Sequence, residues 1–111
     1  MSARLTTHVW IGAYLMRLRA RNIPAFIVAR GDPTAGAVIV KVNTLDGRAA
    51  LFQRSFDLAT GARAWVVLAE GEEASVDASI EKQRSFDRDL WVMEVEDKEG
   101  RHLLDEEGLS E

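Results

Sequence analysis

The stretch HVWIGAYLMRLRARNIPAFIVAR, residues 8–30, decides the fold because it joins two apolar patterns of different period. Its first part repeats apolar residues at helical spacing, and its second part, after Pro24, is an apolar run of strand length. Proline lacks a backbone N–H and forces the residue before it, Ile23, toward extended geometry. The sequence therefore predicts a helix over residues 8–21 or 8–22, followed at once by a strand.

Strand signals continue at short intervals after the proline. The run over residues 24–30 is apolar on both faces, which predicts a strand inside a sheet. In residues 37–44 valines alternate with lysine and asparagine, a pattern typical of a strand with one buried face. Asp-Gly and Thr-Gly turns precede two more strands, over residues 48–57 and 62–70. Parallel neighbours need longer crossovers, so the four strands are expected to form an antiparallel meander.

The sequence changes character after the fourth strand. Residues 72–87 are rich in Ala, Glu, Lys and Gln and carry a narrow apolar stripe, which predicts a second, more solvated helix. We expect a last strand over residues 90–97, a short return strand over residues 101–104 and fraying of the acidic tail, residues 105–111. The predicted fold is α+β, a single domain over residues 1–111. It has an antiparallel sheet of about five strands, both helices on one face, and the order helix, four strands, helix, strand.

Composition excludes several classes of function. The chain of 111 residues has no cysteine, so disulfides, thiolate catalysis, thiolate-bound zinc and iron–sulfur clusters are not available to it. The sequence contains no pattern typical of a secretory signal, and no run reaches the roughly 18 apolar residues that span a bilayer. We therefore expect a cytoplasmic protein without membrane association.

Charge is distributed unevenly along the chain. Residues 1–31 hold five arginines and no acidic residue, whereas residues 70–111 hold fifteen Asp and Glu against five Lys and Arg. Arg17 and Arg21 lie one helical turn apart on the first helix, and we name them as candidate binding residues. Their expected role is pairing with the acidic C-terminal half, within the chain or across a dimer.

The tripeptide Arg-Gly-Asp at residues 30–32 lies between two expected strands. Gly31 and Pro33 supply turn geometry, and the carboxylate of Asp32 can accept backbone amide bonds, so a structural loop is the expected role. Arg30 and Asp32 are the candidate contacting pair if the loop also binds a partner.

The first helix is apolar on two opposite flanks. One is a narrow stripe and the other a broad one. The narrow stripe is Val9, Ala13, Met16 and Ala20, and the broad stripe is Ile11, Tyr14, Leu15 and Leu18. In a small domain such a helix must be enclosed by protein or present one flank to a partner. We assign self-association to the broad stripe, Ile11, Tyr14, Leu15 and Leu18, and expect a homo-oligomer.

Two alternative functions rest on charged residues. A nucleic-acid-binding module would use the arginines Arg17, Arg19, Arg21 and Arg30. The chain has no helix-turn-helix signal and no basic run, and it is acidic overall, so nucleic acid is an unlikely partner. A metal-dependent enzyme would use the carboxylates Asp87, Asp89, Glu94 and Glu96. Carboxylates at the end of a strand are more often leaving the core, so we assign no catalytic residue, metal or cofactor.

The segments RGDPTAGAVIVKVN and DRDLWVMEVED, together with the first helix and GRHLL, resemble the domain-of-unknown-function 1491 (DUF1491) family of small alphaproteobacterial proteins. The resemblance extends over nearly the whole chain. It implies a compact bacterial domain and brings no activity, ligand or catalytic residue with it. From the residues themselves we expect a small, non-enzymatic protein-interaction domain that self-associates.

Overall fold

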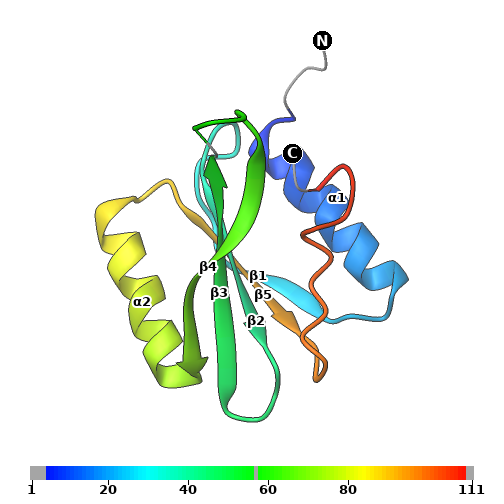
Figure 1. The fold of residues 1–111 in the computed structure, drawn as a ribbon, viewed down its shortest axis with the longest axis vertical. Coiled ribbons are helices and arrows are strands. Elements are labelled where there is room, and N and C mark those ends of the chain that lie inside the picture. Colours follow the sequence, from blue (N-terminus) through cyan, green and yellow to red (C-terminus); the bar gives the residue numbers. More distant parts are fainter. Residues whose placement is uncertain (1–4, 57, 110–111) are drawn as a thin grey trace.

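The computed structural model describes residues 5–56 and 58–109. The described chain forms two helices and five strands (Figure 1). They are α1 (Thr7–Ala20), β1 (Ala25–Ala29), β2 (Val38–Asn43), β3 (Arg48–Phe56), β4 (Arg63–Glu72), α2 (Glu73–Phe86) and β5 (Trp91–Glu96). The α+β class and the order helix, four strands, helix, strand are confirmed. Neither helix is both long and apolar enough to cross a membrane, within the residues described.

The sheet has the strand order β1-β5-β2-β3-β4, which differs from the expected meander. The last strand, β5, lies between β1 and β2, antiparallel to β1 and parallel to β2. Two of the three interior strands, β2 and β5, have residues buried on both faces. The prediction that β2 has one solvated face is therefore wrong.

Strand β1 lies at the edge of the sheet, so its predicted interior position is also wrong. Its inward side chains, Ala25 and Ile27, are half-buried against the core, while Phe26 and Val28 are exposed on the other face. A β-bulge at Val28 interrupts its register with β5. Shortness and a bulge both limit pairing of an edge strand with another chain.

The two helices cover opposite faces of the sheet, as Figure 1 shows, and the prediction of one shared face is wrong. The core under α1 includes Val40 of β2 and Met93 of β5. The core under α2 includes the neighbouring residues Ile39 and Val92. Because successive side chains of a strand point to opposite faces, β2 and β5 contribute apolar side chains to both cores.

The C-terminal segment after β5, residues 98–109, forms turns, and the return strand expected over residues 101–104 is absent from the described chain. Leu103, Leu104 and Leu109 are buried in the core under α1. The segment therefore packs on the domain as far as Leu109, where fraying was expected, because its leucines bury apolar surface. Residues 110 and 111 lie outside the described residues.

Candidate functional site

The broad stripe of α1 lies inside the protein. Ile11, Tyr14 and Leu18 are buried, and Leu15 is half-buried against the same core. The hydroxyl of Tyr14 donates a hydrogen bond to the backbone oxygen of His102 over 2.9 Å, and burial raises the pKa of Tyr14 above its usual value. The sheet and the C-terminal segment cover these side chains. They leave the stripe assigned to self-association almost no surface to offer to a second copy.

The narrow stripe of α1 is exposed instead. Val9, Ala13, Met16 and Ala20 all face solvent, and Met16 is 71% exposed. The four side chains carry no charge and lie along one side of the helix. An uncharged stripe of this kind is a surface on which a partner helix can pack.

The arginines of α1 contact the C-terminal segment, as their expected pairing with the acidic half required. Arg21 forms an ion pair with Glu106 at 2.9 Å, and Arg17 lies 3.8 Å from the same carboxylate. Arg17 also donates a hydrogen bond to the backbone oxygen of Glu107 over 2.8 Å. Two of the four arginines assigned to a nucleic-acid surface therefore hold the tail against the helix.

Loop residues 30–37 connect β1 to β2 and support the start of α1. The backbone oxygens of Pro33 and Thr34 accept hydrogen bonds from the N–H groups of His8 and Thr7, at 2.9 and 3.1 Å. These bonds satisfy first-turn donors that have no partner inside a helix. Asp32 closes the loop, since its carboxylate accepts from the N–H of Ala35 over 2.8 Å.

The loop also packs closely on the chain before β5. The backbone oxygen of Asp32 accepts from Nε1 of Trp91 over 2.7 Å, and the guanidinium of Arg30 lies 5.9 Å from the ring of Trp91. A Cβ atom at Gly31 or Gly36 would collide with the backbone oxygen of Asp89. The Arg-Gly-Asp tripeptide thus has the structural role expected of it.

The carboxylates assigned to a possible enzyme do not converge on one point. Glu94 lies over the centre of the sheet beside Lys41, whereas Asp87 accepts a hydrogen bond from the N–H of Asp89 in the turn after α2. No group of three or more His, Cys, Asp or Glu among the described residues is arranged to hold a metal ion.

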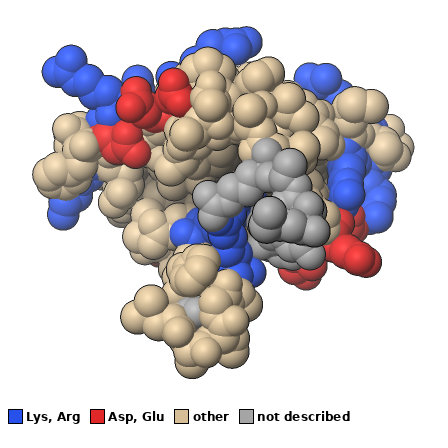
Figure 2. Space-filling view, turned by 90° about the horizontal axis from the view of Figure 1, so that it is seen from above, with Lys and Arg blue, Asp and Glu red and all other residues tan. Residues whose placement is uncertain are grey.

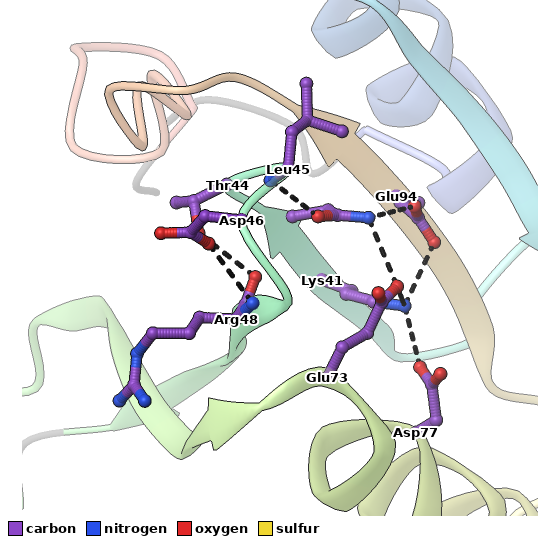
Figure 3. Close-up of polar contacts among 9 residues, drawn as sticks. Lys41, Thr44, Leu45, Asp46, Arg48, Glu73, Asp77 and Glu94 are labelled. Carbon is purple, nitrogen blue, oxygen red and sulfur yellow. Dashed lines mark hydrogen bonds and ion pairs between the residues drawn. The ribbon is translucent and has the colours of Figure 1, made fainter.

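A buried lysine is the centre of the polar contacts under α2. Lys41 of β2 is 4% exposed, and Figure 3 shows Glu73, Asp77 and Glu94 around its ammonium group. Its Nζ lies 2.7 Å from Glu73, 2.7 Å from Asp77 and 3.4 Å from Glu94. Glu73 and Asp77 belong to the first turns of α2, so the lysine fixes that helix on the sheet.

Charge pairing also sets the protonation state of this lysine. Burial alone lowers the pKa of Lys41, but the hydrogen bonds to Asp77 and Glu73 and the charge of Glu94 outweigh burial and raise it. The amine is therefore protonated at neutral pH and cannot act as a nucleophile or a base. Sequence reasoning missed this cluster, although a lysine inside a valine-rich strand was a signal for it.

A second missed arrangement lies on the α1 side of the sheet, where two tryptophans stack. The ring centroids of Trp10 and Trp65 are 5.5 Å apart, and the guanidinium of Arg54 lies 5.4 Å and 5.1 Å from them. These residues line a groove of about 1310 Å³ between the start of α1 and the hairpin of β3 and β4. The sequence signal for this groove was Arg54, a charged residue two positions after Phe52 and on the same face of the strand.

Comparison with known proteins places the sequence in a wider context. Residues 5–105 match the model of a family of proteins of unknown function, DUF1491. The fold is similar to the crystal structure of a DUF1491 family protein from Caulobacter crescentus CB15, with 36% identity, a TM-score of 0.83, and coverage of 92% of this chain and 96% of that one. An NMR structure of a DUF1491 family protein from the same organism has 35% identity and a TM-score of 0.80, and the match covers 94% and 96% of the two chains.

A solution structure of a protein from A. tumefaciens is also similar. It has 28% identity and a TM-score of 0.71, with coverage of 85% of this chain and 86% of that one. No curated protein matches the sequence.

Proposed function

This chain belongs to the DUF1491 family of proteins of unknown function, and we propose that it is a small, cytoplasmic, non-enzymatic domain that pairs with a second copy of itself through α1. One observation carries the proposal. The exposed flank of α1 consists of uncharged residues only, Val9, Ala13, Met16 and Ala20. The proposed interface is therefore the narrow stripe, because the broad stripe, to which the sequence analysis assigns self-association, is buried in the core.

The spacing of this flank suits a helix as its partner. The four residues follow one another at intervals of four, three and four positions. The intervals average about 3.7 residues, close to the 3.6 residues of a helical turn, so the four side chains form one continuous stripe along the helix. Ala13 and Ala20 are small, which allows a second backbone to approach closely. A second copy offers the same flank, as a two-fold symmetric interface requires.

Charges beside the flank favour a second copy as well. Arg19 borders the stripe and forms no ion pair with another described residue. Asp105 and Glu107 of the acidic C-terminal segment are exposed. The backbone oxygen of Glu107 accepts a hydrogen bond from Arg17, which lies on α1 like Arg19. In the proposed pair these acidic groups are candidate partners for Arg19 of the second copy, and opposite charges across an interface favour encounter and register.

Sedimentation velocity over a concentration series tests the proposal. The wild-type chain should show a reversible equilibrium between monomer and dimer. Met16→Glu should weaken it by about tenfold or more, because it places like charges face to face across the two-fold axis. Phe86→Glu is the matched control, since Phe86 is an exposed apolar residue on α2, 77% exposed. A strict monomer at the highest attainable concentration would contradict the proposal, as would equal effects of the two substitutions.

A further inference from the structure

Trp10 carries an unsatisfied donor beside the groove. The residue is 6% exposed, and its Nε1 is buried without a hydrogen-bond partner among residues 5–56 and 58–109. The neighbouring tryptophan differs, because Nε1 of Trp65 donates to the backbone oxygen of Leu109 over 3.1 Å. A buried N–H without an acceptor costs folding free energy, and each such group in a native structure requires a specific explanation. A ligand that brings an acceptor would remove this cost.

The charge of the groove indicates what kind of ligand supplies the acceptor. Arg54 and Arg63 are the basic residues among those that line it, and Asp87 is the acidic one. Figure 2 looks onto this end of the molecule and shows basic side chains at the foot of a projecting lobe. The described lining therefore has one more basic than acidic residue, whereas the whole chain has a net charge of −4. An anionic group is the complementary partner.

The aromatic rings argue against stacked bases as the ligand. Trp10 has Tyr14 on one side, with ring centroids 5.0 Å apart, and Trp65 also stacks on it. The guanidinium of Arg54 lies over both tryptophans. Recognition of single-stranded nucleic acid depends on free ring faces. The remaining polar group of Trp10 is its indole N–H, which can donate a hydrogen bond to a carbonyl or carboxylate oxygen.

The protein already binds an acidic segment of its own beside this site. In the sequence Glu106-Glu107-Gly108-Leu109 the leucine side chain is buried and Gly108 lines the groove. The backbone oxygen of Leu109 accepts from Trp65 and also from the guanidinium of Arg54, at 3.1 and 3.3 Å. An indole N–H and an arginine thus hold a peptide carbonyl of an acidic segment. Trp10 has the same kind of donor, and no carbonyl in the described part of the chain accepts from it.

We propose that the groove binds an extended, acidic peptide segment of a partner protein. A backbone carbonyl or carboxylate of the segment accepts from Nε1 of Trp10, and its acidic side chains lie beside Arg54 and Arg63. The N–H is covered in the free chain, so side chains at the groove wall move aside as the segment enters. The groove volume of about 1310 Å³ exceeds that of a typical small-molecule site and suits a polymer. This proposal is independent of pairing through α1.

Titration of the full-length chain, labelled with ¹⁵N in its tryptophans, tests the proposal. The probe is a synthetic peptide with the sequence DEEGLSE, which has the chemistry of the chain's own tail. We expect the indole signal of Trp10 to shift with saturation and the shift to weaken as salt rises. The indole of Trp91, which donates to Asp32, is the internal reference and should stay in place. Arg63→Glu should weaken binding by about tenfold, and Trp10→Phe should weaken it while Trp91 keeps its signal.

Two further probes separate the alternatives. A peptide with lysine in place of every acidic residue should not bind, and a short single-stranded oligonucleotide should not bind. The proposal is overturned if the acidic peptide leaves the Trp10 signal unmoved at millimolar concentration. It is also overturned if the basic peptide or the oligonucleotide binds as well as the acidic one. Should Arg63→Glu disturb the spectrum of the free chain, Arg63→Gln replaces it, with weaker binding again expected.

Discussion

The two flanks of α1 are both apolar in sequence and have opposite surroundings in the structure. On one flank Tyr14 and Leu18 are fully buried, while on the other Val9 and Met16 are exposed. The difference comes from distant parts of the chain, because Leu104 and Leu109 of the C-terminal segment share the core with the buried flank. The periodicity of a helix thus shows which flanks are apolar, and long-range contacts decide which flank is covered.

The largest expected contrast between the flanks is in folding stability. Leu18→Ala removes a fully buried side chain and should lower the free energy of unfolding by about 2–5 kcal/mol. Met16→Ala, on the exposed flank, should change it by no more than about 0.5 kcal/mol. Chemical denaturation of both variants at one low protein concentration measures the two values. Similar losses in both variants would show that the flanks do not differ as described.

Removal of one hydroxyl tests how the C-terminal segment covers the buried flank. Tyr14→Phe keeps the ring and leaves the backbone oxygen of His102 without its 2.9 Å hydrogen bond. The free energy of unfolding should fall by about 1 kcal/mol. Denaturation is the measurement, and Trp91→Phe, which also removes a donor to a backbone oxygen, serves for comparison. No loss in Tyr14→Phe would mean that this bond does not help to hold the segment.

The ion pairs beside α1 should contribute less to the free energy of unfolding. Glu106→Gln removes the carboxylate that faces Arg17 and Arg21. These groups are partly exposed, so the loss in unfolding free energy should be about 0.2–1 kcal/mol and should shrink at high salt. Thermal denaturation at low and high salt measures it. A loss that does not depend on salt would point to packing of Glu106 as its cause.

The smallest expected effect is a pH dependence from His102, which belongs to the segment over the buried flank. Burial lowers the pKa of His102, and the charge of Asp105 opposes this only in part. The folded state therefore binds a proton less readily than the unfolded state, whose histidine has a pKa of about 6.5. The stability that neutral His102 contributes is present above this pH and is lost as the pH falls below it. His102→Asn should flatten the fall in stability below pH ~6.5, and an unchanged slope would exclude His102 as its source.

Local sequence patterns predicted much of the fold. Pro24 ended the first helix and started a strand, and the turn dipeptides separated β2, β3 and β4. The pairing of β5 with both β1 and β2 could not be predicted, since no local pattern states which of several apolar strands becomes central. The placement of the helices on opposite faces follows from that pairing, so it was missed for the same reason.

The candidate sites depend on long-range contacts even more than the fold does. Arg17 and Arg21 contact Glu106, as the uneven charge of the chain suggested. The stripe of Tyr14 and Leu18 is buried where a partner surface is predicted, because no local pattern indicates that the C-terminal segment returns to cover it. The buried Nε1 of Trp10 could not be predicted, because a donor left unpaired among the described residues becomes visible only once its surroundings are known.

A dilution series followed by ¹H–¹⁵N spectra tests the central claim most directly, because it locates self-association on the helix residue by residue. The account predicts that dilution shifts the backbone signals of the exposed flank, centred on Ala13 and Met16, together with Arg19. Signals of Tyr14, Leu18 and the strands should stay in place. Spectra that do not change with concentration, or changes confined to β1 or α2, would contradict it.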